Sequence, residues 1–317
     1  MRSAVLLLVG CVPVLSGCIG IPRYSATRTE TKELATEPLT ALDLSTFNGD
    51  VNVRSWDKPE VVMEINYKAY GTSEEAANAN CETLTCDIQA EDGTLILKAT
   101  KPSNQWSAAA DFTITAPIDC GLKIHTSNGN VDIADFVAGA NIKTSNGKIK
   151  LRNMADVVVA GSSNGTIDAA GMQGPVDFDT SNGRIMYSGR LVGEDNKFTT
   201  SNGRVEISLP EDSLTEVTAK TSNGRVKCDI PEQEVFKQKK NSMHVLVGTA
   251  KSEEPAAKAN VRSSNGSITI KAIEEMEVVP GDMPTTPEGS EQGLPDIVSS
   301  ESISSGQAEV ADSALSF

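Results

Sequence analysis

Residues 126–129 read Thr-Ser-Asn-Gly, and this phrase, with Ser for Thr in two copies, occurs seven times in the chain. The copies end at Gly129, Gly147, Gly165, Gly183, Gly203, Gly224 and Gly266. Their spacing is 18 residues at first, then 20 and 21, and 42 before the last copy, and a relaxed eighth copy occupies residues 46–49. A short repeat of nearly constant length predicts a stacked repeat architecture rather than an ordinary globular domain.

Apolar residues recur at fixed distances from each Asn-Gly pair. The second residue after the Gly is always Val or Ile: Val51, Val131, Ile149, Ile167, Ile185, Val205, Val226 and Ile268. Polar residues alternate with these and with further apolar columns, which is the period-two pattern of strands with one buried face. Each unit therefore predicts a strand, an Asn-Gly bend and a second strand.

We interpret the Asn and Gly of the repeats as structural. Both residues adopt positive φ at little cost, so a sharp bend in each unit would select them. We also expect each Asn amide to bond to its counterpart in the next unit, which would form a ladder along the stack. The residues concerned, besides the glycines above, are Asn128, Asn146, Asn164, Asn182, Asn202, Asn223 and Asn265.

Two all-β architectures fit the apolar columns. In a β-solenoid each unit of 18–21 residues makes one coil, and successive coils pair through parallel strands. In a meander each Asn-Gly closes a hairpin between antiparallel strands. Short connections of nearly constant length, together with an apolar column beyond the second strand, favour the β-solenoid.

Residues 50–128 interrupt the repeat and predict a small strand-helix-strand cap. Residues 73–83 are rich in Ala and Glu after a Gly-Thr-Ser start, and we expect a short helix there. The expected strands are residues 61–67, 85–89, 95–99 and 112–116. We therefore divide the folded region into a cap with the first repeat (39–120) and the repeat solenoid (121–273).

The spacing of 42 residues before the last copy is about two repeat lengths, so we expect one degenerate repeat unit there, which has lost the Thr-Ser-Asn-Gly sequence. We expect residues 231–241 to form a charged loop and residues 243–247 to form a strand without its own Asn-Gly. The last coil would then leave an exposed sheet edge near Ile270, where a partner strand could pair.

The N-terminus predicts export. Arg2 precedes an apolar run that is too short to span a bilayer, and residues 15–18 read Leu-Ser-Gly-Cys. This stretch resembles the cleavage box of bacterial lipoproteins, which implies a signal peptide (1–17), an acylated Cys18 and a tether (18–38). Ile19 in place of Asp favours the outer membrane or cell surface by the same resemblance. The partner this implies is a membrane, reached through the lipid anchor.

Charge and cysteine content limit the remaining partners. The net charge of −15 argues against nucleic acid, because phosphate binding requires a basic surface. Residues 274–317 contain ten Asp or Glu and no Lys or Arg, so we expect a disordered acidic tail. Outside the cytoplasm, Cys81 and Cys86 could form a local disulfide. Neither residue spacing nor neighbouring His suggests a metal or cofactor site.

The order of elements resembles the bacterial putative adhesin domain family. The residues that carry the resemblance are Leu42-x-Leu44-x-Thr46-Phe47-Asn48-Gly49-Asp50-Val51-x-Val53-x-x-Trp56-Asp57, the strand-helix-strand insert, and Phe112-Thr-Ile-Thr-Ala-Pro117 before the serial repeats. The resemblance covers residues 39–273. It implies an exported or envelope-associated β-rich repeat protein and supplies no catalytic residues.

A column of cations gives the strongest hint of a ligand. Lys148, Arg184, Arg204 and Arg225 each follow a repeat Gly. On stacked coils these four residues would form a positive stripe able to bind anionic glycans or lipid headgroups. A second outward column adds Lys143, Lys220 and Arg262. The alternative is a face whose charges serve only solubility. The predicted function is a non-enzymatic adhesive or binding scaffold.

Two other functions remain open. A polysaccharide-cleaving enzyme would need two carboxylates about 5–10 Å apart, but Asp132, Asp168 and Glu206 are separated by other residues in their shared column, and we expect no catalysis. His125 and His244 lack a recognisable catalytic partner. A structural spacer or docking protein of the envelope, with another envelope protein as its partner, is the third possibility.

Overall fold

The computed structural model describes residues 9–11, 24–35, 39–103, 107–231, 233–248 and 257–273. The predicted acylation site Cys18 and the acidic tail lie outside the described residues. So does the expected signal peptide, apart from the short strand β1 (Val9–Cys11), which pairs with β2 (Tyr24–Ala35).

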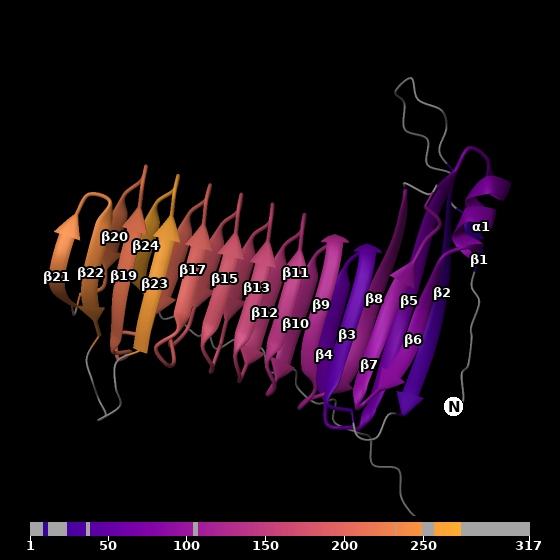
Figure 1. Ribbon diagram of the computed structural model, residues 1–317, viewed down its shortest axis with the longest axis horizontal. Helices are drawn as coiled ribbons and strands as arrows, with labels where there is room; N and C mark the ends of the chain where they lie inside the picture. The colour runs from indigo at the N-terminus through magenta and orange to yellow at the C-terminus, as the bar shows by residue number, and fades with distance from the viewer. Residues whose placement is uncertain are drawn as a thin grey trace, which may run out of the picture. The chain divides into compact units, whose positions relative to one another are not determined.

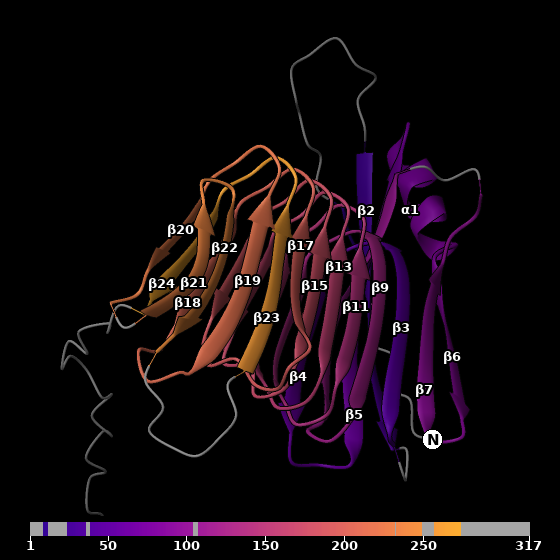
Figure 2. The same cartoon turned by 60° about the vertical axis from the view of Figure 1, so that its left-hand side comes forward.

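The described strands form two sheets of 12 strands each, between which the chain coils (Figures 1 and 2). In the repeat region each coil gives one strand to each sheet. Sheet A contains β4 (Val51–Trp56), β10 (Val131–Phe136), β12 (Ile149–Met154), β14 (Ile167–Ala170), β16 (Ile185–Ser188), β18 (Val205–Leu209), β24 (Ile268–Ala272) and β20 (Val226–Asp229). Sheet B contains β3 (Ala41–Asn48), β9 (Gly121–Asn128), β11 (Ala140–Thr144), β13 (Val158–Ser162), β15 (Val176–Thr180), β17 (Asn196–Thr200), β23 (Ala257–Ser263) and β19 (Thr215–Thr221).

Neighbouring strands of the coils are parallel, and equivalent repeat positions face each other. Val131 pairs with Ile149, and Ile149 pairs with Ile167. In sheet B, Ile124 pairs with Ile142. A meander would pair consecutive strands antiparallel, so these registers confirm the predicted β-solenoid.

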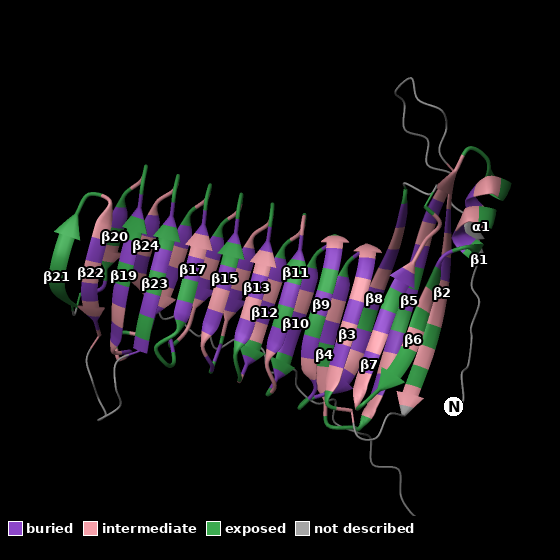
Figure 3. Cartoon of the chain, in the orientation of Figure 1, coloured by how far each residue is buried: buried purple, intermediate pink, exposed green. Residues whose placement is uncertain are grey.

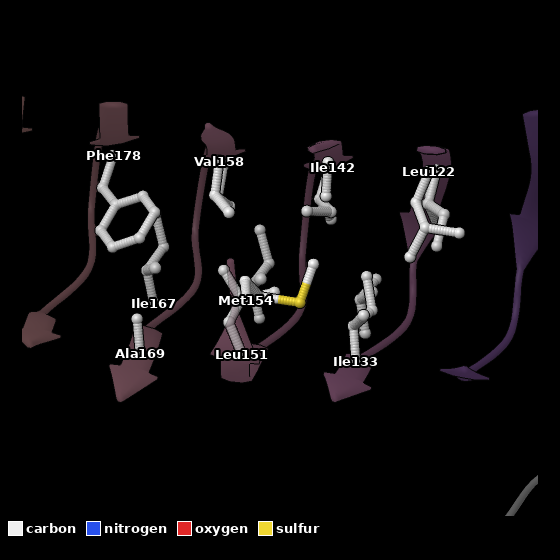
Figure 4. Close-up of a cluster of buried hydrophobic side chains, with 14 of the residues drawn as sticks. Leu122, Ile133, Ile142, Leu151, Met154, Val158, Ile167, Ala169 and Phe178 are labelled. Atoms are coloured by element: carbon white, nitrogen blue, oxygen red, sulfur yellow. The ribbon is translucent and has the colours of Figure 1, made fainter. Parts of the chain in front are cut away.

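The predicted apolar columns form the core. Buried and exposed residues alternate along the strands (Figure 3). The inward side chains fill the space between the two sheets, inside the coils. There Leu151 and Met154 of sheet A lie against Val158 of sheet B (Figure 4). Phe178 and Phe198 stack edge to face with ring centres 5.8 Å apart.

The predicted asparagine ladder is present. It runs along the Asn-Gly edge, by which we mean the edge where strands of sheet B turn into strands of sheet A. Asn146 Nδ2 donates to Asn128 Oδ1 at 2.6 Å, and Asn164 Nδ2 donates to Asn146 Oδ1 at 2.8 Å. The same bond joins every neighbouring pair from Asn48 to Asn223.

The reason expected for the repeat glycines is wrong. None of the seven has a positive φ; among the copies only Gly49 of the relaxed one does. Instead, a Cβ on a repeat Gly would overlap the carbonyl oxygen of the Gly in the neighbouring coil. That oxygen also accepts a hydroxyl bond, as from Thr144 Oγ1 to Gly129 O at 3.1 Å. Glycine is required because successive backbones approach too closely for any side chain.

The last repeat unit does not stack at the end of the solenoid. β23 lies between β17 and β19, and β24 lies between β18 and β20. The far edge of β19 is taken by β22 (Ser242–Val247), so the last coil can enter only on the near side. The predicted free edge near Ile270 is therefore wrong, because β24 has neighbours on both sides.

The degenerate unit is a hairpin. The expected strand at 243–247 is confirmed as β22, but the expected loop at 231–241 is wrong for most of its length. Residues Gln233–Lys239 form β21, which pairs antiparallel with β22 and is the outermost strand of sheet B. All of its residues are exposed, so no apolar alternation marks it in the sequence.

The cap has the predicted elements. β8 (Ala108–Pro117) and β7 (Thr94–Thr100) continue the two sheets, and β5 (Glu60–Gly71) and β6 (Thr85–Glu91) pair with them. The predicted helix is α1 (Glu74–Glu82), and its first turn is capped by the Ser73 hydroxyl, which accepts from the Ala76 N–H at 3.1 Å.

Part of the predicted tether is a strand. Residues Tyr24–Ala35 form β2, which pairs with β5 along its whole length. Its core-facing residues include Ala26 and Arg28, and the Arg28 guanidinium lies 4.4 Å from the centre of the Tyr67 ring. Because one of the core-facing positions is an arginine, the sequence of this strand does not show the alternation of apolar and polar residues by which the other strands were predicted.

The predicted disulfide between Cys81 and Cys86 is absent, and both are free thiols. Cys81 Sγ donates to the Tyr67 carbonyl at 3.7 Å, whereas Cys86 Sγ donates to its neighbour Asp87. Burial raises the pKa of both thiols, to about 11 for Cys86, so the thiolate needed for oxidation is scarce at neutral pH.

Replacing Gly183 with Ala should destabilise the fold by about 1–3 kcal/mol, because the new methyl group meets backbone that cannot move aside. Gly161 is a matched control: a Cβ there would meet only Asp179 O, at 3.9 Å. Gly161→Ala should change the free energy of unfolding by less than about 0.5 kcal/mol. Urea unfolding of both variants measures this, and equal effects would refute the close-approach explanation.

Candidate functional site

The residue after each repeat Gly stands in one column along the Asn-Gly edge. Backbone bonds at about 3 Å fix the order of this column: Val131 N to Lys148 O, Ile149 N to Thr166 O, Ile167 N to Arg184 O, Ile185 N to Arg204 O, Val205 N to Ser267 O, Ile268 N to Arg225 O and Val226 N to Lys240 O. Neighbouring strands lie about 4.8 Å apart. Arg184 and Arg204 are therefore neighbours, whereas Ser267 separates Arg204 from Arg225.

Lys148 differs from the other members of the predicted stripe. Its ammonium lies 2.8 Å from Asp168 Oδ2, so its charge is already neutralised. Arg184, Arg204 and Arg225 are exposed, and no acidic group of the described residues forms an ion pair with them. The positive stripe is thus concentrated at the C-terminal end of the solenoid.

Cations from sheet B flank the same end of the edge. Arg262 and Lys220 are neighbours in register on β23 and β19, and both are exposed. The turn between β21 and β22 adds Lys239 and Lys240, since Lys239 pairs with Ser242 and Ser242 pairs with Lys220. We call the cluster the basic corner; it comprises Arg204, Arg225, Lys220, Arg262, Lys239 and Lys240.

Lys239 and Lys240 were missed as site residues in the sequence. The signal in the sequence was the basic run Lys237-Gln238-Lys239-Lys240. Because residues 231–241 were predicted to be a loop, the sequence did not show where in the fold this run would lie. Only the hairpin geometry brings this run to the Asn-Gly edge.

The acidic groups near the basic corner are engaged elsewhere. Lys227 binds Asp229 at 2.6 Å, Lys271 binds Glu206 at 3.1 Å, and the His244 ring bonds to Glu216 at 2.7 Å. None of the six cations forms an ion pair within the described part of the chain. The corner can therefore attract anions even though the chain carries a net charge of −15.

The outward carboxylates of sheet A do not form a catalytic pair. Lys150 lies between Asp132 and Asp168, and Met186 lies between Asp168 and Glu206. Asp132 is bound by Arg54 at 2.9 Å and by Lys150 at 3.1 Å. This arrangement gives the carboxylates the role of countercharges on a solvated face.

The pKa of Asp168 also opposes a general-acid role. Burial would raise this pKa, but hydrogen bonds from Lys148 and Arg152 outweigh burial and lower it. A glycosidase acid needs a raised pKa. The pKa of Asp179 is raised by burial and by neighbouring Asp177, but this side chain belongs to the outward face of sheet B, away from the Asp168 column.

One shallow apolar groove of about 450 Å³ opens at the edge opposite the Asn-Gly edge. Its only charged lining residues, Asp43 and Lys123, neutralise each other at 2.7 Å. Among the described residues no cluster of His, Cys, Asp or Glu could hold a metal ion. No helix in the described ranges is long and apolar enough to cross a membrane.

Residues 35–271 match the sequence profile of the family described as Toastrack DUF4097. The chain belongs to this family. The match covers the region whose order of elements carries the resemblance, and it confirms that resemblance. Several solved structures similar to this Toastrack chain are named putative adhesins. One from Bacteroides fragilis is 15% identical over 77% of this chain and 97% of its own (TM-score 0.37).

Two further solved structures are similar to the Toastrack chain. A putative cell adhesion protein from Clostridium sporogenes is 13% identical over 77% of this chain and 99% of its own (TM-score 0.32). A putative lipid binding protein from Parabacteroides distasonis is 13% identical over 78% and 97% (TM-score 0.27). No curated protein matches the chain.

The two aspartates predict opposite pH effects. A lowered pKa means that ionised Asp168 stabilises the fold above its ordinary pKa of 3.8, and that this stabilisation is lost as the pH falls through the folded value. Asp168→Asn should therefore lower stability at pH 7 and match the wild type more closely at pH 3. Asp179→Asn should raise stability at pH 7, because ionising a carboxyl with a raised pKa opposes folding.

Urea unfolding at both pH values measures these differences. Effects of the same sign for the two variants at pH 7 would contradict the assignment.

Proposed function

We propose that this Toastrack protein is a non-enzymatic binding scaffold of the cell envelope, anchored through acylated Cys18, that binds anionic groups at the basic corner. The observation that carries the proposal is the cluster of six exposed cations on a strongly acidic chain. The ligand chemistry is phosphate or carboxylate, presented by an envelope polysaccharide or by lipid headgroups.

The rigidity of the site supports binding. The carbonyls of Arg204 and Arg225 accept backbone bonds from the coil on one side, and the next residues, Val205 and Val226, donate to the strand or turn on the other side. Arg262 pairs with strands on both sides. Guanidinium groups bind phosphate and carboxylate in a bidentate manner, and a fixed spacing along the edge suits a repeating anionic polymer. Exposed Ser222 and Ser264 lie on the same edge and can donate hydroxyl bonds to such a ligand.

The lipid anchor has its own test. The lipoprotein box predicts that the full chain takes up labelled palmitate in its native host and that Cys18→Ser does not. Equal labelling of the two chains would remove the anchor from the proposal, without affecting the basic corner.

Reversing two charges of the basic corner tests the binding site. The full-length double variant Arg204→Glu/Arg225→Glu should bind a sulfated polysaccharide or vesicles with anionic lipids at least about tenfold more weakly than the wild type. The binding of the wild type should weaken with salt, because exposed charges are screened.

Lys148→Glu/Lys150→Glu is the matched control, since it makes the same change in net charge at cations already paired with Asp168 and Asp132. This control should bind nearly as well as the wild type. Equal loss in both variants would show an effect of net charge alone, and binding that survives in both would refute the site. Preference for the polysaccharide over the vesicles, or the reverse, identifies the source of the anionic group.

A spacer or docking role is the second candidate. It is favoured by one observation, the strand β21 at the end of sheet B, all of whose residues are exposed. Absence of binding to either anionic probe would favour this role over the first.

A further inference from the structure

The two sheets end at different levels at the C-terminal end of the solenoid. Sheet A stops at β20, whereas sheet B continues through β22 to β21 (Figures 1 and 2). The outer edge of β21 has no strand partner among the described residues, and its apolar side chains Val235 and Phe236 are 42% and 52% exposed. Such an edge is a template for another strand.

At the other end of the molecule the last described strand of sheet B is β6, which pairs on one side with β7 and has no second partner among the described strands. Ile88 and Cys86 of β6 are partly buried against the core, because they lie opposite Leu97 and Ala99 of β7. Asp87, which lies between them, points outward and is exposed, and Glu91 at the end of the strand is exposed as well. The same sheet thus offers one open edge at each end.

The two ends carry opposite charges. The exposed charged residues on α1, on β6 and in the turn after β6 are acidic: Glu74, Glu75, Glu82, Asp87, Glu91 and Asp92. The exposed cation nearest in register is Lys98 of β7, which lies opposite Asp87. Those on β21 and its turn are mostly basic, namely Lys237, Lys239 and Lys240 against Glu234. Two copies placed end to end would bring unlike charges together.

Strand direction allows the two edges to pair. β6 is antiparallel to β7, which is parallel to β3 and the coil strands of sheet B. β21 is antiparallel to β22, which is antiparallel to β19, so β21 runs with the coil strands. In a continued sheet β21 of one copy and β6 of the next are therefore antiparallel.

The side-chain pattern selects a register. Val235 lies opposite Val245 on the inward face, and Lys237 lies opposite His244 on the outward face. Val235 placed opposite Ile88 of the next copy keeps apolar groups inside. With the bulge at Phe236 retained, Lys237 then faces Asp87.

We propose that copies of this chain associate head to tail, with β21 of one copy pairing with β6 of the next. This contact is heterologous, so it leaves a free edge at both ends of each assembly and generates linear assemblies rather than closed dimers. The inference goes beyond anion binding, because its key contact joins Lys237 to Asp87 and Lys237 lies outside the basic corner. Lys239 and Lys240 of the corner add only to the overall charge of this end.

Charge exchange tests the contact. The full-length chain carrying Cys18→Ser, which keeps acyl chains from driving association, should show a sedimentation coefficient that rises with concentration at low salt. In this background Lys237→Asp alone and Asp87→Lys alone should each weaken association by about tenfold, because each places like charges opposite one another. An equimolar mixture of the two variants restores opposite charges at each contact and should associate like the parent chain.

Lys197→Asp is the matched control, since Lys197 lies in mid-sheet and pairs with Asp177. This variant should associate like the parent chain. Val235→Lys, which puts a charge on the inward face of the edge, should leave monomers with an unchanged circular dichroism spectrum. A parent chain that stays monomeric at all concentrations would overturn the proposal, and so would equal effects of Lys237→Asp and Lys197→Asp.

Discussion

The close approach of successive backbones at the Asn-Gly edge is the constraint on which the fold depends. A Cβ on any repeat glycine would overlap the glycine carbonyl of the neighbouring coil. Once the backbones are this close, each Asn amide reaches the next Asn and each Thr or Ser hydroxyl reaches the neighbouring glycine carbonyl. The four residues of the repeat thus serve one purpose, which is to hold coil against coil in exact register along one edge.

This register gives the protein its surface chemistry. Because every coil repeats the same positions, the residue after each Gly forms a column with the spacing of strands. Where an acidic residue lies nearby, as Asp168 does beside Lys148, the column is neutralised. At the C-terminal end the acids are bound by other groups and the hairpin adds Lys239 and Lys240. A local imbalance of charge therefore arises on a scaffold that is otherwise uniform and acidic.

The sequence predicted the coil architecture, the core columns, the asparagine ladder and the cap helix, because each depends on a local pattern that repeats. It could not predict the stacking order of the coils. The sequence of the repeat that forms β23 and β24 resembles that of the other repeats. Its place in the stack, before the coil of β19 rather than after it, follows from the pairing of β22 with the other edge of β19. The strand β21 has no buried residue and so no pattern. The role of the repeat glycines was predicted wrongly, because a positive φ and a close backbone contact both require a residue without a side chain. The sequence therefore cannot distinguish the two reasons.

Hydrogen exchange at the turns tests the central claim most directly. The backbone N–H of Asn164 donates to Ser145 O at 2.8 Å, and that of Asn182 donates to Ser163 O at 2.8 Å, although both side chains lie at an exposed turn. If the stacked edge holds the coils together, these amides exchange only on global unfolding, as slowly as core strand amides such as that of Ile167. Fast exchange at Asn164 and Asn182, as in ordinary surface turns, would contradict the account.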